Sequence, residues 1–419
     1  MSQEPHDRPL IELLEALPKS DLHVHLDGSL RLATLIELAR DGRVELPSRT
    51  EEGLRSQVFK PAYANLNEYL QGFRYTVAVL QSAEALERAA YELAEDCWNE
   101  GVCYLEVRFA PQLHVHERLP LDEVVHAVAR GIARAELEFN RDPRVRAGEF
   151  PPFRGAILFC ALRFALPDFS RGYRAYFESS QFSLPGEVIQ RASLDLARAA
   201  AHYRNEVGLP VTGLDLAGQE KGYPAEQHLE GFRVAHQAFL GKTVHAGEDF
   251  GPESIFQAIG DLHADRIGHG TTLLDASAVT DPSVRDRDAY IDRLCQYVAD
   301  HRITLEVCLT SNQQTIPDLA RDLSRHPFGE MVRRRLSTTI CTDNRLVSNT
   351  SVTREVERAV QTFGLDLKVL HDLLTYGFKR SFFPGPYLEK RTYVRTALDV
   401  MDRVIADWKS RHPDHLLAR

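Results

Sequence analysis

The chain has 419 residues, and its 60 acidic and 50 basic side chains give a formal net charge of −10 at neutral pH. This acidic balance, with no block of lysine and arginine, argues against a nucleic-acid-binding surface. The N-terminal segment lacks a basic region followed by an apolar core, and no apolar run reaches about 18 residues, so we expect a cytoplasmic protein without a membrane partner.

Eight apolar segments, each followed by helical or loop sequence, predict β-strands along the chain. This alternation is typical of a (β/α)8 TIM barrel, and such barrels reach this length as one unit. We therefore predict a single elaborated barrel over residues 1–419, with a short N-terminal tail at 1–17 and a polar, partly disordered tail at about 408–419. The predicted strands lie near residues 20–26, 103–109, 154–161, 211–216, 242–246, 264–268, 303–308 and 338–342.

The connection between the first two predicted strands, residues 27–102, is far longer than an ordinary crossover, so it must contain extra helices. We expect these helices to form a lid. Within them, residues 83–99 place Leu86, Ala90 and Leu93 on one stripe, which predicts a helix packed on the core. Residues 59–73 mix aromatic and aliphatic side chains, a pattern that fits either the mouth of a pocket or an amphipathic helix packed on the barrel.

The first predicted strand carries the sequence DLHVH, in which His23 and His25 point to the same side because strand side chains alternate. Two histidines spaced in this way also occur on protein surfaces and in cores, so the motifs further along the chain decide whether they bind a metal. TVHAGE supplies His245 and, three residues later, Glu248, while CTDN supplies Asp343. Each follows or ends an apolar run, and the carboxyl ends of barrel strands are where active sites gather.

Three neutral imidazoles and one carboxylate suit a zinc-like cation and leave one position for water. The metal would lower the pKa of that water toward neutrality. Other divalent ions of similar ligand preference fit the same donors. The residues that match this description are His23, His25, His245 and Asp343.

The ordered motifs DLHVHLDGS, GLDLAG, TVHAGE, RIGHG, EVCLTSN and CTDN resemble those of the adenosine deaminase family of metal-dependent amidohydrolases, from residue 18 to about residue 384. The resemblance implies a hydrolase with one Zn²⁺ per subunit, held by the same four residues. It also implies hydrolytic deamination of adenosine and deoxyadenosine to inosine and deoxyinosine, with release of ammonia. The partner is then a small-molecule purine nucleoside, and nothing in the sequence specifies an oligomeric state.

Attack of water on purine C6 requires a proton at ring nitrogen N1. Glu248 matches the family's proton shuttle, a role that needs a pKa raised by burial, and the alternative is a carboxylate at a helix N-terminus. His269, in RIGHG, matches the residue that orients the attacking water and stabilises the developing charge. The alternative for His269 is a buried histidine bonded to backbone.

Matches to substrate contacts come from single residues within these motifs. Gly218 matches the glycine whose backbone N–H meets purine N3, although a turn glycine is an alternative, and Asp27 matches the acceptor of the ribose 5′-hydroxyl, although it could instead cap a helix. His25 is expected to face the substrate as well as the metal. Asp215 could orient a metal ligand or be only a strand-end carboxylate.

One position departs from the family pattern, because many members carry a second aspartate where this chain has Asn344. An aspartate must be protonated to donate to purine N7, whereas the Asn344 amide donates without a shifted pKa. Purine recognition is retained, but the substrate subgroup is open: the alternative to adenosine is another 6-aminopurine compound, either adenine or an aminofutalosine-type nucleoside.

Other enzyme classes lack their signatures in this sequence. The His-x-Glu and Pro-Cys-x-x-Cys motifs of nucleic-acid-editing zinc deaminases are absent, as are a G-x-S-x-G elbow and a Walker loop. Six scattered cysteines form no C-x-x-C pair and are expected to be reduced thiols without a catalytic role. A catalytically inert barrel kept for binding is the rival from another class, and the intact metal ligands and Glu248 count against it.

Overall fold

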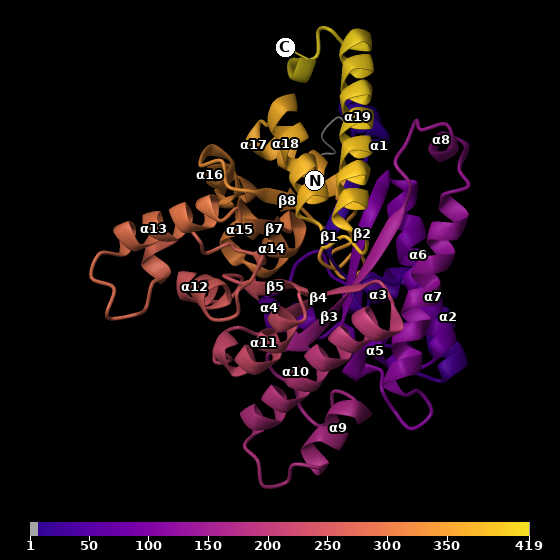
Figure 1. The fold of residues 1–419 in the computed structure, drawn as a ribbon, viewed down its shortest axis with the longest axis vertical. Coiled ribbons are helices and arrows are strands. Elements are labelled where there is room, and N and C mark those ends of the chain that lie inside the picture. Colours follow the sequence, from indigo (N-terminus) through magenta and orange to yellow (C-terminus); the bar gives the residue numbers. More distant parts are fainter. Residues whose placement is uncertain (1–6, 419) are drawn as a thin grey trace.

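The computed structural model describes residues 7–418. Eight parallel strands pair in sequence order around a barrel, with helices on the outside (Figure 1). A bridge between Val24 and Asp343 brings the chain after the last strand back to the first, so the predicted TIM barrel is confirmed. The strands are β1 (Lys19–His25), β2 (Val102–Phe109), β3 (Arg154–Leu162), β4 (Val211–Ala217), β5 (Gly241–Ala246), β6 (Arg266–His269), β7 (Thr304–Val307) and β8 (Thr338–Ile340).

The helices fill the connections between strands and cover the barrel. The α-helices are α1 (Arg8–Ala16), α2 (Leu32–Gly42), α3 (Glu51–Gln57), α4 (Leu66–Leu70), α5 (Phe73–Val79), α6 (Ala83–Asn99), α7 (Leu121–Phe139), α8 (Pro143–Arg146), α9 (Arg171–Glu178), α10 (Pro185–His202), α11 (Leu229–Gln237), α12 (Pro252–Gly260), α13 (Arg287–Asp300), α14 (Leu309–Thr315), α15 (Pro317–Arg321), α16 (Phe328–Arg333), α17 (Val352–Phe363), α18 (Leu367–Arg380) and α19 (Tyr387–Arg411). Short turns of 3₁₀ or π type are η1 (Pro111–Leu113), η2 (Tyr203–Val207), η3 (Ala225–His228), η4 (Ala276–Ala278), η5 (Leu323–Arg325) and η6 (Leu416–Ala418).

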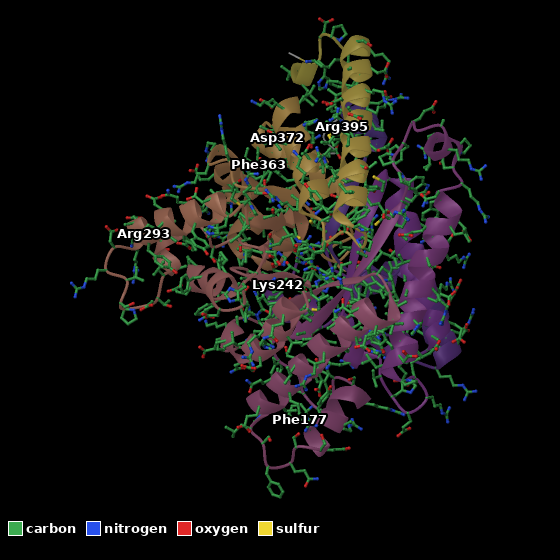
Figure 2. The ribbon with its side chains drawn as sticks, in the orientation of Figure 1. Phe177, Lys242, Arg293, Phe363, Asp372 and Arg395 are labelled. Atoms are coloured by element: carbon green, nitrogen blue, oxygen red, sulfur yellow. The ribbon has the colours of Figure 1, made fainter. Side chains whose placement is uncertain are left out.

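The strands form where the sequence is apolar and β-branched, because a barrel wrapped in helices buries both faces of its sheet. Every residue of β1, β2 and β4 is buried. The eight predicted strands agree with the observed ones to within two residues at each end. Lys242 of β5, labelled near the middle of Figure 2, is itself buried and pairs with Asp265 at 2.8 Å.

Five helices, α2 to α6, lie between β1 and β2, as the length of that connection predicts. Helix α6 buries Leu86, Ala90 and Leu93 in the core, which confirms the predicted stripe. The pocket interpretation of residues 59–73 holds for Leu66, Tyr69, Leu70 and Phe73, whose side chains line the central cavity, whereas the segment is not one amphipathic helix, because residues 59–65 are not helical. Phe59 is buried in the core, whereas Phe73 lines the central cavity.

The predicted tails are wrong for the part of them that the structure describes. Residues 8–16 form the amphipathic helix α1, which packs against α17 and α19, and α19 runs beside it at one end of the molecule (Figure 1). Trp408 is fully buried, and its Nε1 donates to the carbonyl oxygen of Pro9 at 2.8 Å. An apolar helix face and a large indole bind the two ends together, although the flanking sequence is polar. Residues 1–6 and 419 lie outside the described residues.

Helix α9 and its neighbours form a smaller apolar cluster beside the main core, and Phe177 of α9, labelled in Figure 2, packs against it. All six cysteines are buried and free, as expected. None of the helices in residues 7–418 is both long enough and apolar enough to cross a membrane.

Candidate active site

The sequence motifs meet at the carboxyl ends of the barrel strands, around one cavity of about 750 Å³. The barrel fold gathers them because all eight parallel strands end on the same side. Of the predicted site residues, His23 lies beneath the cavity wall with no exposed surface. The others line the cavity: His25, Asp27, Gly218, His245, Glu248, His269, Asp343 and Asn344.

The four predicted metal ligands converge on one point. His23, His25, His245 and Asp343 each offer a ligand atom, and these atoms all lie within 4.8 Å of one another. The Nε2 atoms of His25 and His245 are 3.2 Å apart, and Oδ1 of Asp343 lies 3.5 Å from Nε2 of His23 and of His25.

Partners on the opposite ring nitrogens decide which way two of these imidazoles face. Nδ1 of His23 lies 2.8 Å from Oε2 of Glu306, and Nδ1 of His245 lies 3.2 Å from Oδ1 of Asp215 and 3.1 Å from the carbonyl oxygen of Leu216. A carboxylate or a carbonyl accepts a hydrogen bond, so Nδ1 of each ring is the donor, and Nε2 is the nitrogen left to turn a lone pair toward a metal ion in the site.

Buried lone pairs that face one another repel unless a cation lies among them. Nε2 of His23 has no hydrogen-bond partner among the described residues. Imidazole nitrogens with one carboxylate oxygen are the donors that zinc and similar divalent ions prefer. The residues present therefore fit a metal ion of this class.

A second layer of charged residues inside the barrel supports these ligands. Arg108 of β2 is completely buried; its Nη2 lies 2.9 Å from Oε2 of Glu306 and its Nη1 lies 3.2 Å from Oδ2 of Asp215. Burial acts to raise the pKa of Glu306, but Arg108 and Arg266 outweigh it and hold that pKa well below its ordinary range. One guanidinium thus anchors both carboxylates that contact the predicted metal ligands His23 and His245. The GLDLAG motif suggests this role for Asp215, whereas no local sequence pattern marks Arg108 or Glu306.

Glu248 lies just beyond β5, with its carboxyl group buried in the cavity wall. Burial raises the pKa of Glu248 well above its ordinary value, and the nearby carboxylates of Asp343 and Glu220 raise it further. Glu220 fixes the local backbone by accepting the N–H groups of Gly247 and Glu248, at 3.0 and 2.9 Å. A carboxyl group of raised pKa can hold a proton at neutral pH and deliver it to a substrate atom.

His269 ends β6 and faces Glu248, with Nε2 at 3.5 Å from Oε1 of the glutamate. Burial lowers the pKa of His269 well below its ordinary value, and the neighbouring His23 adds to this. His269 and Asp343 have backbone φ angles of +63° and +60°, a left-handed conformation that is uncommon outside glycine and asparagine. Such conformations cluster at functional sites, where the surrounding fold holds them in place.

The predicted substrate contacts occupy the same cavity. Oδ1 of Asp27 is buried and has no hydrogen-bond partner within residues 7–418, and burial raises the pKa of this carboxyl to about 7. Gly218 has φ +97°, and a Cβ there would meet nothing closer than the Arg163 nitrogen at 3.8 Å, so backbone conformation explains the glycine better than crowding does. Nδ2 of Asn344 donates to the Tyr69 hydroxyl at 2.9 Å, which ties the last strand's loop to α4.

The comparisons with known proteins agree with this geometry. The family model described as adenosine deaminase matches residues 18–150 and 188–394, which is most of the chain. The chain belongs to the adenosine deaminase family. It is 37% identical over 360 residues to the adenosine deaminase of Mycobacterium marinum, covering 85% of this chain and 88% of the relative. It is also 37% identical over 380 residues to adenosine deaminase 1 of Streptomyces coelicolor, covering 90% of this chain and 85% of the relative.

Solved structures share the adenosine deaminase fold at lower identity. An amidohydrolase of Burkholderia ambifaria with bound Zn has a TM-score of 0.74 at 21% identity, covering 98% of this chain and 97% of its own. The adenine deaminase of Arthrobacter aurescens has a TM-score of 0.71 at 21% identity, covering 92% of this chain and 99% of its own. Residues 151–187 fall outside the family model, and Phe164, Phe169 and Ser170 from this span line the cavity.

Proposed function

We propose that this protein hydrolyses adenosine and deoxyadenosine to inosine and deoxyinosine with release of ammonia, using one zinc ion per chain. The observation that carries the proposal is the juxtaposition of two features in one cavity. Three imidazoles and Asp343 converge as a set of possible metal ligands, and the buried carboxyl of Glu248, whose pKa burial raises, lies on the same cavity wall.

His23, His25, His245 and Asp343 would hold the ion. When bound there, zinc polarises a water molecule and lowers its pKa toward neutrality, which makes it a nucleophile at neutral pH. Glu306 and Asp215 keep the Nε2 lone pairs of His23 and His245 turned toward the ion. Their contribution is orientation, fixed before any substrate binds.

Glu248 would donate its proton to purine N1, which removes negative charge from the ring as the C6 carbon is attacked. Burial keeps this carboxyl protonated until a basic ring nitrogen arrives. His269 would orient the attacking oxygen through its ring N–H, and its low pKa keeps the ring neutral while it does so.

The remaining contacts would select the substrate. The backbone N–H of Gly218 would meet purine N3, one Asn344 N–H would meet N7, and Asp27 would accept from the ribose 5′-hydroxyl. Asn344 has a second N–H left after its bond to Tyr69, since a side-chain amide carries two. His25 would border both the ion and the purine.

The first experiment follows the ultraviolet change and ammonia release with adenosine, deoxyadenosine, adenine, AMP and an aminofutalosine analogue, using zinc-loaded protein. We expect adenosine and deoxyadenosine to be converted far faster than adenine, AMP and the aminofutalosine analogue. A preference for another aminopurine would keep the mechanism and correct the substrate. Inactivity on every substrate would support the inert-barrel alternative.

The metal assignment has its own test. Asp343→Ala removes one ligand and should lose both bound zinc and activity, whereas Glu248→Gln should lose activity and keep the metal. An Asp343→Ala variant with full zinc occupancy would refute the assignment.

Other expectations from the sequence stay predictions. These are the single domain over residues 1–419, the lid formed by α2 to α6, the cytoplasmic location and the lack of nucleic-acid or membrane partners.

A further inference from the structure

A chain of three hydrogen bonds runs from the backbone of α16 to His269 through buried side chains. The Phe328 backbone N–H donates to Nδ1 of His326 at 3.1 Å. Nε2 of His326 lies 3.2 Å from Oδ1 of Asn312, and Nδ2 of Asn312 lies 3.0 Å from Nδ1 of His269. All three side chains are buried, with at most 2% of each exposed.

The backbone amide fixes the direction of every bond in this chain, because an amide N–H can only donate. Nδ1 of His326 therefore accepts and carries no proton. Burial lowers the pKa of His326 to about 3, so the ring is neutral at physiological pH and its one proton lies on Nε2. That N–H donates to Oδ1 of Asn312, which leaves the amide nitrogen of Asn312 to donate to His269.

The reverse arrangement conflicts with the same backbone group. If the amide of Asn312 were turned around, its N–H₂ would face the N–H of His326, and its oxygen would face Nδ1 of His269. Two buried donors would then oppose each other, and a buried unsatisfied donor costs about 1 to 3 kcal/mol. His326 cannot relieve the conflict by moving its proton to Nδ1, because the Phe328 N–H already points there.

We propose that Asn312 and His326 are positioning residues that hold His269 in the tautomer with its proton on Nε2. Nδ1 of His269 receives the Asn312 N–H, so the ring proton must lie on the other nitrogen. Nε2 of His269 has no hydrogen-bond partner among residues 7–418 and faces the cavity 3.5 Å from Oε1 of Glu248. A donor is thereby aimed, before the substrate arrives, at the place where the attacking oxygen would lie. The last step rests on the proposed function, whereas the tautomer does not.

Nitrogen NMR of the full-length, zinc-loaded protein labelled with ¹⁵N at histidine reads the tautomer directly, since protonated and unprotonated ring nitrogens resonate far apart. His269 is assigned from the signals missing in His269→Gln. The expected result for the wild type is a protonated Nε2 and an unprotonated Nδ1. Asn312→Asp places a carboxylate, which only accepts, beside Nδ1 and should move the proton of His269 to Nδ1.

Two variants of His326, at the far end of the hydrogen-bond chain, distinguish a positioning role from a packing role. His326→Gln keeps an N–H that can donate to Oδ1 of Asn312 and should keep the wild-type tautomer. His326→Phe fills the space without a donor and should give a mixture of tautomers. In steady-state assays, Asn312→Asp should lower kcat by about a hundredfold with unchanged zinc content, and His326→Gln should be much less affected than His326→Phe.

A wild-type spectrum with the proton of His269 on Nδ1 would overturn the proposal, and this measurement needs no variant to fold. Equal spectra for His326→Gln and His326→Phe would overturn the role of His326. A wild-type protein with the expected tautomer but no deaminase activity would instead refute the proposed function and leave the hydrogen-bond chain standing.

Discussion

Nδ1 of His23 on β1 lies 2.8 Å from Oε2 of Glu306 on β7, across the interior of the barrel. The same oxygen accepts a hydrogen bond from Nη2 of Arg108 at 2.9 Å. Because this carboxylate is held by strands that are far apart in sequence, the ring of His23 is oriented by the closed barrel and not by its own local backbone.

Removing the charge of Glu306 should weaken metal binding. Glu306→Gln keeps the shape but turns an amide N–H₂ toward donors on His23, Arg108 or Arg266, so the ring of His23 loses its fixed orientation. We expect the zinc dissociation constant to rise about 10- to 100-fold, measured by competition with a chromogenic chelator. Glu52→Gln, on the surface of α3, is the control. Equal zinc affinity in the two variants would show that Glu306 does not orient the ligand.

Removing the acid of Glu248 should abolish turnover and spare the metal. Glu248→Gln cannot deliver a proton to N1, and we expect kcat to fall about 100- to 10,000-fold, measured by the conversion of adenosine to inosine. Zinc content, measured by atomic emission, should equal that of the wild type. The exposed Glu226→Gln serves as control. Activity within a few fold of the wild type would remove Glu248 from the mechanism.

The carboxyl group of Asp27 should make stability depend on pH. Its pKa is raised by burial from 3.8 to about 7, so it favours the folded state at low pH, and this contribution is lost as pH rises toward 7. Asp27→Asn lacks this loss. Between about pH 5 and pH 7, we expect the free energy of unfolding of the wild type to fall by about 2 kcal/mol relative to that of Asp27→Asn. Above pH 7 the difference should change little.

Urea unfolding of both proteins at several pH values measures this difference, and Asp168→Asn, at an exposed aspartate that also lines the cavity, is the control. A difference between wild type and Asp27→Asn that does not change with pH would contradict the prediction.

The contact between the two ends of the chain should stabilise the whole fold. Trp408→Ala leaves a cavity and removes the hydrogen bond to Pro9, and we expect the free energy of unfolding to fall by about 3 to 5 kcal/mol, measured with urea. Leu416, which is 82% exposed, supplies the control variant Leu416→Ala. A loss no larger than that of the control would mean that the C-terminal segment is dispensable.

Much of the barrel and the metal site could be predicted from local sequence. The two-residue period of a strand puts His23 and His25 on one side, and apolar runs mark each strand. The parallel order of the strands then brings Asp343 to the same end of the barrel as the histidines. These inferences need only periodicity and the direction of the chain.

The supporting residues escaped prediction because their partners are remote. In the sequence, Arg108 and Glu306 are only single charged residues within apolar strands, and 198 positions separate them. The link from His326 to Asn312 depends on how η5 and α16 turn back over α14, which no pattern within either segment specifies. The polar C-terminal sequence likewise concealed the burial of Trp408, since a single indole can anchor a segment that is otherwise exposed.

The seam of the barrel lies directly at the predicted metal ligands. The His25 N–H donates to the Asp343 carbonyl oxygen and the Asp343 N–H donates to that of His23, both at 2.8 Å. These residues come from the first strand and from the segment after the last strand, and closing so long a loop carries an entropic cost. A cation held by the side chains of the same three residues would link the first strand to the segment after the last, so that metal binding would stabilise the closed barrel as well as supply the reactive centre.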